Sequence, residues 1–323
     1  MSELFELDGL AADLLAVLAI PFAALGEPGH RLWWPTLVTS ALLAIIALRS
    51  PPLRARVRAA LSSPDAFLDL RYFLLNSFVE LLLLTPVLAA SAAAASLVGA
   101  PLEATVPDPT PGAFGLVELA LALGYLLVFD LAAFLTHLAF HKIPLLWPFH
   151  AVHHSAEELT PLLVMRVHPV ERLITGLAIG AAVGLFQGLA WRLAPEAAMA
   201  RWQGANLFLV GFFLAGYHLR HSPLAIDWPS PLRRLLISPL HHQIHHSRAP
   251  EHRDCNLGLV FSFWDRLAGT LRELPAGADP AGLRFGEDGE ATPRAVHELY
   301  LRPFRRIAAM WAVWRSSAAT DGN

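Results

Sequence analysis

Histidines are concentrated in one part of this chain. Twelve of its 15 histidines fall between His137 and His246. Histidine is the commonest side-chain metal ligand because the neutral imidazole offers a nitrogen lone pair. Packing alone gives no reason to gather so many titratable rings, which repel one another once they are protonated. The concentration therefore predicts that these rings share bound cations.

The spacing of the histidines repeats. The triplet His150-Ala-Val-His153-His154 has the same spacing as His242-Gln-Ile-His245-His246. In a helix the first and fourth positions share a face, and the adjacent histidine lies about 100° round, so we expect each triplet to give two rings to one ion and the third to another. An upstream pair four residues apart also shares one helix face. It consists of His137 and His141.

These eight rings exceed the roughly four to six ligands that one ion takes, but they fit two ions. His218 and His221 add further rings, His168 and His252 are weaker candidates, and His241 is spare. The predicted metal ligands are His137, His141, His150, His153, His154, His218, His221, His242, His245 and His246.

Imidazole suits zinc, copper, iron and nickel, so neighbouring residues must narrow the choice of metal. The His-Glu-x-x-His helix of zinc proteases is absent, and so is the pair of helical Glu-x-x-His motifs of soluble di-iron bundles. Asp130 lies two helical turns before His137, where a carboxylate would accept the second ring N–H of a ligand. A histidine-rich, carboxylate-poor pair of irons is the best chemical fit. With electrons from outside, it would use dioxygen to attack an unactivated C–H bond.

The composition places this chemistry in a membrane. The chain is 55% hydrophobic and 16% charged, against about 25% charged residues in an average soluble domain. The net charge of −3 and the lack of a basic run give no support for nucleic-acid binding. A single cysteine, Cys255, excludes an intramolecular disulfide and any cysteine-rich metal site.

Apolar segments alternate with polar stretches along the chain. A bilayer core about 30 Å thick needs roughly 20 mostly apolar residues in a helix. The apolar segments are residues 10–25, 32–48, 72–98, 114–134, 173–191 and 205–217, the last of which is short. They predict an all-α polytopic membrane bundle of four to six membrane helices.

The positive-inside rule assigns the arginine-rich stretch 49–71 to the cytoplasm and the acidic loop 101–112 to the other side. This topology brings every histidine group to the cytoplasmic face, under a histidine-rich helical cap formed by residues 222–269. The acidic N-terminus lacks the basic region of a cleaved signal peptide, so we expect the first apolar segment to be retained.

Three regions are expected on this basis. Residues 1–112 would form N-terminal membrane helices, residues 113–272 the metal-binding domain, and residues 273–323 a loop and an amphipathic helix. That helix, at residues 293–315, suits a membrane interface and equally suits packing as an ordinary surface helix.

From about residue 130 to residue 270, the chain resembles the fatty acid hydroxylase superfamily, also called the sterol desaturase family, of membrane di-iron enzymes. The stretches that carry the resemblance are DLAAFLTHLAFH, LLWPFHAVHHSAEELT, MRVHPVE, LRHS, SPLHHQIHHS and HRDCNLGLVFSFWDRLAGT. Leu138 stands where the family often has Arg, and Pro223 where it often has Asn. The resemblance also draws attention to residues around the ligands, namely Asp130, Arg166, His168, Glu171, Asp254 and Asn256.

The resemblance implies a membrane oxidoreductase, a lipid hydroxylase or desaturase with two iron ions and dioxygen as co-substrate. Electrons would come from an external donor, a small haem or iron–sulfur protein with its reductase. The chain has no Gly-x-Gly-x-x-Gly nucleotide fingerprint, which supports an external donor. Near the last histidines, four arginines would either dock an acidic donor or meet lipid phosphates. They are Arg233, Arg234, Arg248 and Arg253.

Other classes of protein stay open at this point. A histidine-lined metal-ion transporter needs ionisable residues along a path across the bilayer, and a bis-histidine haem protein takes its axial ligands singly from facing helices. A zinc-dependent membrane hydrolase would need no dioxygen. The lipid is also open among sterol, fatty acyl chain, sphingolipid, ether lipid and carotenoid.

Overall fold

The computed structural model describes residues 19–47, 51–99, 115–195, 199–202, 205–275, 277–287 and 289–320. These residues are mostly helical. A short antiparallel sheet pairs β1 (Arg201–Trp202) with β2 (Ala205–Asn206), Arg201 lying opposite Asn206. The predicted all-α class is therefore confirmed.

Three described helices are long and apolar enough to cross a membrane. They are α4 (Pro64–Ser96), α5 (Leu116–Lys142) and α7 (Pro169–Leu193). The apolar helices α2 (Trp34–Ala47) and α8 (Leu207–Leu214) are shorter. The chain is an integral membrane protein with a helical bundle. Most of the segment 10–25 and the acidic loop 101–112 lie outside the described residues, so the count of four to six membrane helices stays a prediction.

Helices α4 and α7 pack through a row of glycines. The glycines recur at every fourth residue of α7 and contact successively later parts of α4, so the two helices run parallel. A Cβ atom at Gly180 would lie only 2.9 Å from the carbonyl oxygen of Val87. Small residues allow membrane helices to approach this closely. The row consists of Gly176, Gly180, Gly184 and Gly188.

Helix α4 begins inside the polar stretch, eight residues before the predicted apolar segment. The Ser63 side chain accepts a hydrogen bond from the N–H of Ala66 at 3.2 Å, and Pro64 occupies the first turn. Both residue types favour a helix start at these positions. The preceding arginine-rich residues form a separate helix, α3 (Pro51–Leu61).

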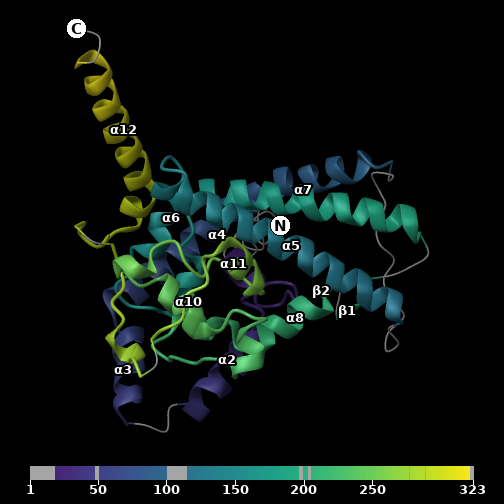
Figure 1. Cartoon of the computed structure of the whole chain (residues 1–323), viewed down its shortest axis with the longest axis horizontal. Helices are drawn as coiled ribbons and strands as arrows, with labels where there is room; N and C mark the ends of the chain where they lie inside the picture. The colour runs from purple at the N-terminus through teal and green to yellow at the C-terminus, as the bar shows by residue number, and fades with distance from the viewer. Residues whose placement is uncertain are drawn as a thin grey trace, which may run out of the picture.

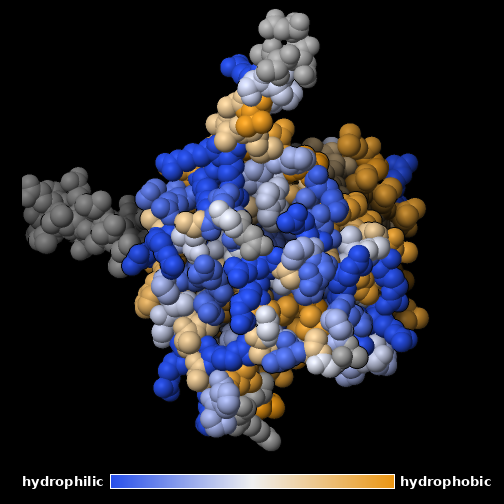
Figure 2. Space-filling view, turned by 60° about the vertical axis from the view of Figure 1, so that its left-hand side comes forward, coloured by the Kyte–Doolittle hydropathy of each residue, from blue (hydrophilic) through white to orange (hydrophobic). Residues whose placement is uncertain are grey.

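The cap gathers at one end of the bundle, where α5 ends and α7 begins (Figure 1). Its surface is largely hydrophilic (Figure 2). Its helical elements are α6 (Trp147–His154), η1 (Pro161–Met165), η2 (Tyr217–His221), α9 (Ser230–Arg233), α10 (Pro239–His245), η3 (Pro250–His252), α11 (Phe263–Ala268) and η4 (Pro280–Gly282). The last helix, α12 (Val296–Thr320), projects from the cap.

A buried apolar core joins the cap to the bundle. It brings Phe73 of α4 and Leu126 of α5 together with Met165 of η1, Phe213 of α8 and Phe261 of the segment before α11. Burial of such side chains stabilises each one by roughly 1.5–3 kcal/mol relative to exposure. The core therefore fixes the elements that carry the histidines relative to one another.

Candidate metal centre

Nine of the ten predicted ligands form two groups within the described residues. In each group, every histidine has one ring nitrogen that lies within 4.8 Å of a ring nitrogen of each other histidine in the group. Cluster 1 consists of His137, His141, His150, His154 and His245. Cluster 2 consists of His153, His221, His242 and His246. The rings come from α5, α6, α10, η2 and the residue that follows α10.

The structure divides each triplet between the clusters, but not in the expected pairs. His150 and His154 enter cluster 1, and His153 turns to cluster 2. The second triplet is divided the other way: His245 alone joins cluster 1, and His242 and His246 join cluster 2. The expected pairing of first and fourth positions was wrong. The first and fifth positions lie about 40° apart on a helix and the first and fourth about 60°, so the four-residue spacing aligns two rings better.

Backbone carbonyls fix which ring nitrogen carries the proton. His137 Nδ1 lies 2.7 Å from the Leu257 oxygen, His245 Nδ1 2.8 Å from the Cys255 oxygen, and His153 Nδ1 3.3 Å from the Arg166 oxygen. A carbonyl oxygen only accepts, so each Nδ1 must donate its N–H. The Nε2 atom of each neutral ring then presents a lone pair.

Nε2 atoms of neighbouring rings lie close together inside each cluster, and those of His137 and His150 meet lone pair to lone pair, because both Nδ1 atoms have acceptors. The Nε2 atoms of His137 and His150 are 3.0 Å apart, and those of His221 and His242 are 2.8 Å apart. The Nε2 atoms of His141 and His245 are buried without a hydrogen-bond partner among the described residues. Two lone pairs repel at this distance unless a cation lies between them.

The clusters fit metal ions in both geometry and chemistry. Nitrogens bound about 2.1 Å from an ion lie within about 4.2 Å of one another, close to the spread in each cluster. Burial lowers the pKa of the His150 ring to about 3 and those of His153 and His242 well below their ordinary value. These rings are therefore neutral at neutral pH and able to bind a metal.

Two carboxylates stand behind cluster 1. Glu171 Oε1 lies 2.7 Å from His150 Nδ1, and Asp254 Oδ1 lies 3.1 Å from His141 Nδ1. The hydrogen bond from His141, with that from Lys142, lowers the pKa of Asp254 to about 2. A carboxylate that accepts the second ring N–H orients a ligand and raises its basicity. Asp254 thus lies directly behind the His141 ring.

Asp130 and Asn256 have other partners than the expected ligand rings. Asp130 accepts hydrogen bonds from the N–H groups of Val260 and Phe261 and from Trp264 Nε1, at 2.8, 2.9 and 3.0 Å. The His137 ring donates instead to the Leu257 carbonyl, so the expectation that Asp130 orients a histidine was wrong. Asn256 donates to the carbonyls of His241 and Arg272. Both residues hold the segment whose Leu257 carbonyl binds His137, and so they position a histidine indirectly, through that segment.

Four further histidines lie outside the clusters, and three of them contact the scaffold. His218 Nε2 donates to the Arg31 carbonyl at 2.7 Å, and His218 lies outside both clusters. His168 caps α7 by accepting from the Val170 N–H and contacts the Tyr300 carbonyl through Nε2. His241 forms a capping box with Ser238 at the start of α10. His252, in η3, also lies outside both clusters.

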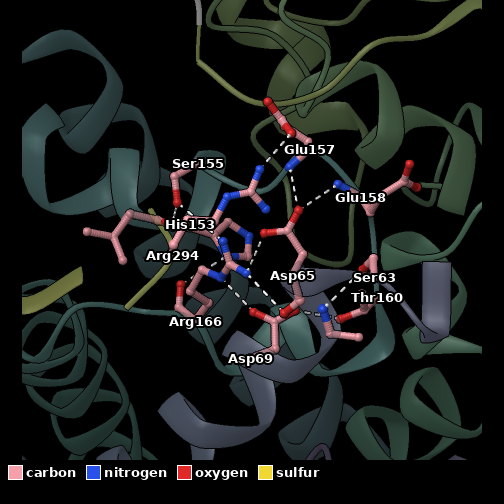
Figure 3. A network of polar contacts seen from close by, with 12 residues as sticks. Ser63, Asp65, Asp69, His153, Ser155, Glu157, Glu158, Thr160, Arg166 and Arg294 are labelled. Atoms are coloured by element: carbon pink, nitrogen blue, oxygen red, sulfur yellow. Dashed lines mark hydrogen bonds and ion pairs between the residues drawn. The ribbon is translucent and has the colours of Figure 1, made fainter. Parts of the chain in front are cut away.

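A buried ion-pair network supports cluster 2 (Figure 3). The guanidinium of Arg166 is fully buried and bonds to Asp69 at 2.5 Å and to Asp65 at 2.9 Å. The carbonyl of the same arginine holds the His153 ring. The network therefore links the first turns of α4 to a ligand of cluster 2.

The sequence reasoning missed both aspartates of this network. Their signal was present: Asp65 and Asp69 are four residues apart, directly after a Ser-Pro helix start in an otherwise basic stretch. Such a pair occupies one helix face and calls for a buried cation.

A pocket of about 680 Å³ opens beside the clusters. Rings from both clusters line it, His141, His154 and His245 from the first and His246 from the second. Its outer wall includes Met310 of α12. A molecule in this pocket would therefore touch both clusters.

Comparison with known proteins agrees with this geometry. Residues 122–270 match the fatty acid hydroxylase family. The chain is 27% identical to the ornithine lipid hydroxylase OlsE of Rhizobium tropici, over 62% of this chain and 53% of the relative. It is 28% identical to the alkylglycerol monooxygenase of Caenorhabditis elegans, over 44% of this chain and 25% of the relative.

The human cholesterol 25-hydroxylase is 28% identical over 46% of this chain and 49% of the relative. The chain thus spans between a quarter and about half of the length of these relatives. No solved structure gives a significant match. The matched segment contains all nine histidines of the two clusters, and over this segment the chain is similar to the fatty acid hydroxylase family.

Proposed function

We propose that this protein is an oxygen-dependent hydroxylase or desaturase of a membrane lipid, with one iron ion in each histidine cluster. One observation carries the proposal: two closed groups of imidazoles direct their Nε2 atoms inward beside a shared pocket. Nine nitrogen ligands exceed what one ion takes and suit two. Residues 113–272 would form the catalytic domain.

The relatives support a lipid substrate. By their names, they hydroxylate an ornithine lipid, oxygenate an alkylglycerol and hydroxylate cholesterol. Three different lipids among the relatives leave the substrate of this chain defined only as a lipid. The metal-transporter alternative finds less support, because the clusters gather at one end of the membrane helices instead of lining a path along them.

Bound iron would supply the activation of dioxygen and the oxidant for a C–H bond. The chain itself holds the ligand rings in one tautomer through the carbonyls of Leu257 and Cys255. Glu171 and Asp254 retain the Nδ1 protons of two further rings, which strengthens them as ligands. The pocket wall, with Trp147 and Met310, would hold the lipid and keep water from the reacting carbon.

We place the cap on the cytoplasmic side, because the basic helix α3 with Arg54, Arg56 and Arg58 belongs to the same end of α4. The external electron donor would meet the cap near Arg248 and Arg253, which line the pocket. Arg233 is paired with Asp227 at 2.9 Å and so is a weaker part of this docking patch.

Metal analysis of anaerobically purified protein, followed by lipid analysis of cells with and without the gene, tests the function. We expect about two irons per chain and a lipid that gains one oxygen or loses two hydrogens only in air. The variant His245→Ala should lose this product, and His297→Ala, at an exposed position on α12, should keep it. Full activity of His245→Ala, or product formation without oxygen, would refute the proposal. Metal flux into liposomes would favour a transporter instead.

A further inference from the structure

Helix α12 consists of a docked half and a projecting half. Near its start, Leu299 is buried and the Phe304 ring contacts Phe149, with ring centroids 5.4 Å apart. Beyond Arg306 the helix leaves the cap (Figure 1), and its side chains are exposed, including Trp311 and Trp314 at 52% and 62%. Large aromatic side chains exposed on a projecting helix call for a covering surface.

The exposed apolar side chains of α12 form a stripe. Leu301, Phe304 and Trp311 lie three and seven residues apart, which places them on one helix face, and Trp314 extends the same face by one turn. In Figure 2 the lower part of the projecting arm shows orange and tan residues, with pale blue residues above them.

The charge of α12 complements an anionic surface. The helix contains one acidic residue, Glu298, and four arginines. Arg302 and Arg306 form ion pairs with Glu290 of the preceding loop, and Arg305 and Arg315 are exposed. Arg305 and Arg315 lie four residues after Leu301 and Trp311, so they flank the apolar stripe. Arginines beside such a stripe can extend to lipid headgroups, and amphipathic helices with this composition lie in the interface of anionic bilayers.

The position of α12 fits the same surface. The helix runs across the direction of α5 and α7, at the end of the bundle that carries the cap (Figure 1). If α5 and α7 cross the bilayer, a helix in this orientation lies along the membrane plane and not through it. Tryptophan is also the residue enriched at that depth.

We propose that α12 lies in the headgroup layer of the leaflet next to the cap and binds anionic lipid there through its aromatic stripe and exposed arginines. Arg306, Ala309 and Met310 of the same helix line the pocket beside the clusters. The seated helix therefore brings the pocket to the lipid surface, so that a lipid enters beside α12. This entry route rests on the proposed function, whereas the seating of the helix does not.

Spin labels on the full-length protein in vesicles test the seating. In a Cys255→Ser background, one label replaces Trp311 on the apolar stripe and another replaces Ser316 on the opposite face. In vesicles with phosphatidylglycerol, we expect oxygen to reach the first label and a water-soluble nickel complex to reach the second. Equal access of the nickel complex to both labels would overturn the seating. Spin–spin broadening between chains, which would mean that a second copy covers the stripe, would also overturn it.

Charge-reversal variants test whether the exposed arginines of α12 are needed for binding to anionic lipid. Arg305→Glu with Arg315→Glu should raise nickel access to the label at position 311 several-fold in vesicles with phosphatidylglycerol. Arg266→Glu, at an exposed arginine of α11 in the cap, is the control and should leave it unchanged. An identical label response in the double variant and the control would overturn the anionic preference.

Steady-state kinetics test the proposed route by which the lipid enters the pocket. Met310→Trp should raise the KM for vesicle lipid and leave kcat unchanged, whereas an unchanged KM would overturn the route. A wild-type protein without any oxygenase activity would instead refute the proposed function and leave the label result standing.

Discussion

The two histidine clusters are built from the same side chain, yet their surroundings differ. Cluster 1 has carboxylates behind it, Glu171 on His150 and Asp254 on His141. Cluster 2 has a backbone carbonyl behind one ring and the cation of Arg220 close to His221 and His242. The carboxylates therefore orient two rings of cluster 1 and raise their basicity as ligands.

Access differs as well. Cluster 1 gives three rings to the wall of the pocket and cluster 2 gives one. The Nδ1 atoms of His221 and His242 are buried without hydrogen-bond partners among the described residues. Cluster 1 thus combines tighter orientation with contact to the pocket, and we expect the two ions to respond differently to substitution.

The largest effect should come from removing a ligand from one cluster at a time. His150→Ala should empty cluster 1 and His242→Ala cluster 2, each reducing iron from about two to about one per chain. Turnover should fall by more than about 100-fold, since loss of an outer partner alone costs about 10–100-fold. Iron analysis with Mössbauer spectra measures both. Loss of both irons in each variant would show that the clusters are not independent.

A large effect on stability is expected at the network behind cluster 2. Arg166→Met leaves Asp65 and Asp69 buried without their cation, which should destabilise the protein by roughly 3–5 kcal/mol and loosen cluster 2 first. Arg233→Met, which removes an ion pair with Asp227 on the cap, is the control and should destabilise the protein far less, because exposed ion pairs contribute little. Denaturant unfolding in detergent compares them. Equal losses would argue against a special role for Arg166.

A smaller effect is expected when a carboxylate behind cluster 1 is neutralised, because all the ligand rings stay in place. Asp254→Asn should lower the affinity of cluster 1 for iron by about 10–100-fold and leave cluster 2 unchanged. Asp227→Asn, which breaks an ion pair elsewhere on the cap, controls for general damage. Competition with a chelator measures each affinity, and an unchanged cluster 1 would contradict the role given to Asp254.

The smallest effect is expected at His218. Its ring donates to the Arg31 carbonyl, and a glutamine amide can donate in its place. His218→Gln should therefore retain both irons and nearly full turnover. Loss of iron in this variant would return His218 to the ligand set.

The sequence was sufficient for what depends on spacing and length. The apolar lengths of α4, α5 and α7 predicted the bundle. The two triplets, the upstream pair and His221 are the nine histidines that the structure brings into two groups. Asp130 lies two turns before His137, yet its oxygens are taken by N–H groups that are 130 residues away in sequence. The partner of a buried carboxylate is chosen by competition among distant donors, which spacing cannot reveal.

The same limit applies to the network behind cluster 2. Asp65 and Asp69 precede Arg166 by about 100 residues, and only the packing of α4 against η1 joins them. The pairing within the triplets, by contrast, could have been predicted from helix geometry, because residues four apart lie at a smaller angle around the helix than residues three apart.

The glycine row of α7 has a consequence for how a lipid travels. Where Gly184 faces Ser91, and Gly180 faces Val87, the backbones of the two helices touch directly. Such a seam has no slot wide enough for a hydrocarbon tail. A lipid that moves between the bilayer and the pocket must therefore pass around the α4–α7 interface. A bulky side chain in this interface would push the two helices apart and would not create a path for the lipid.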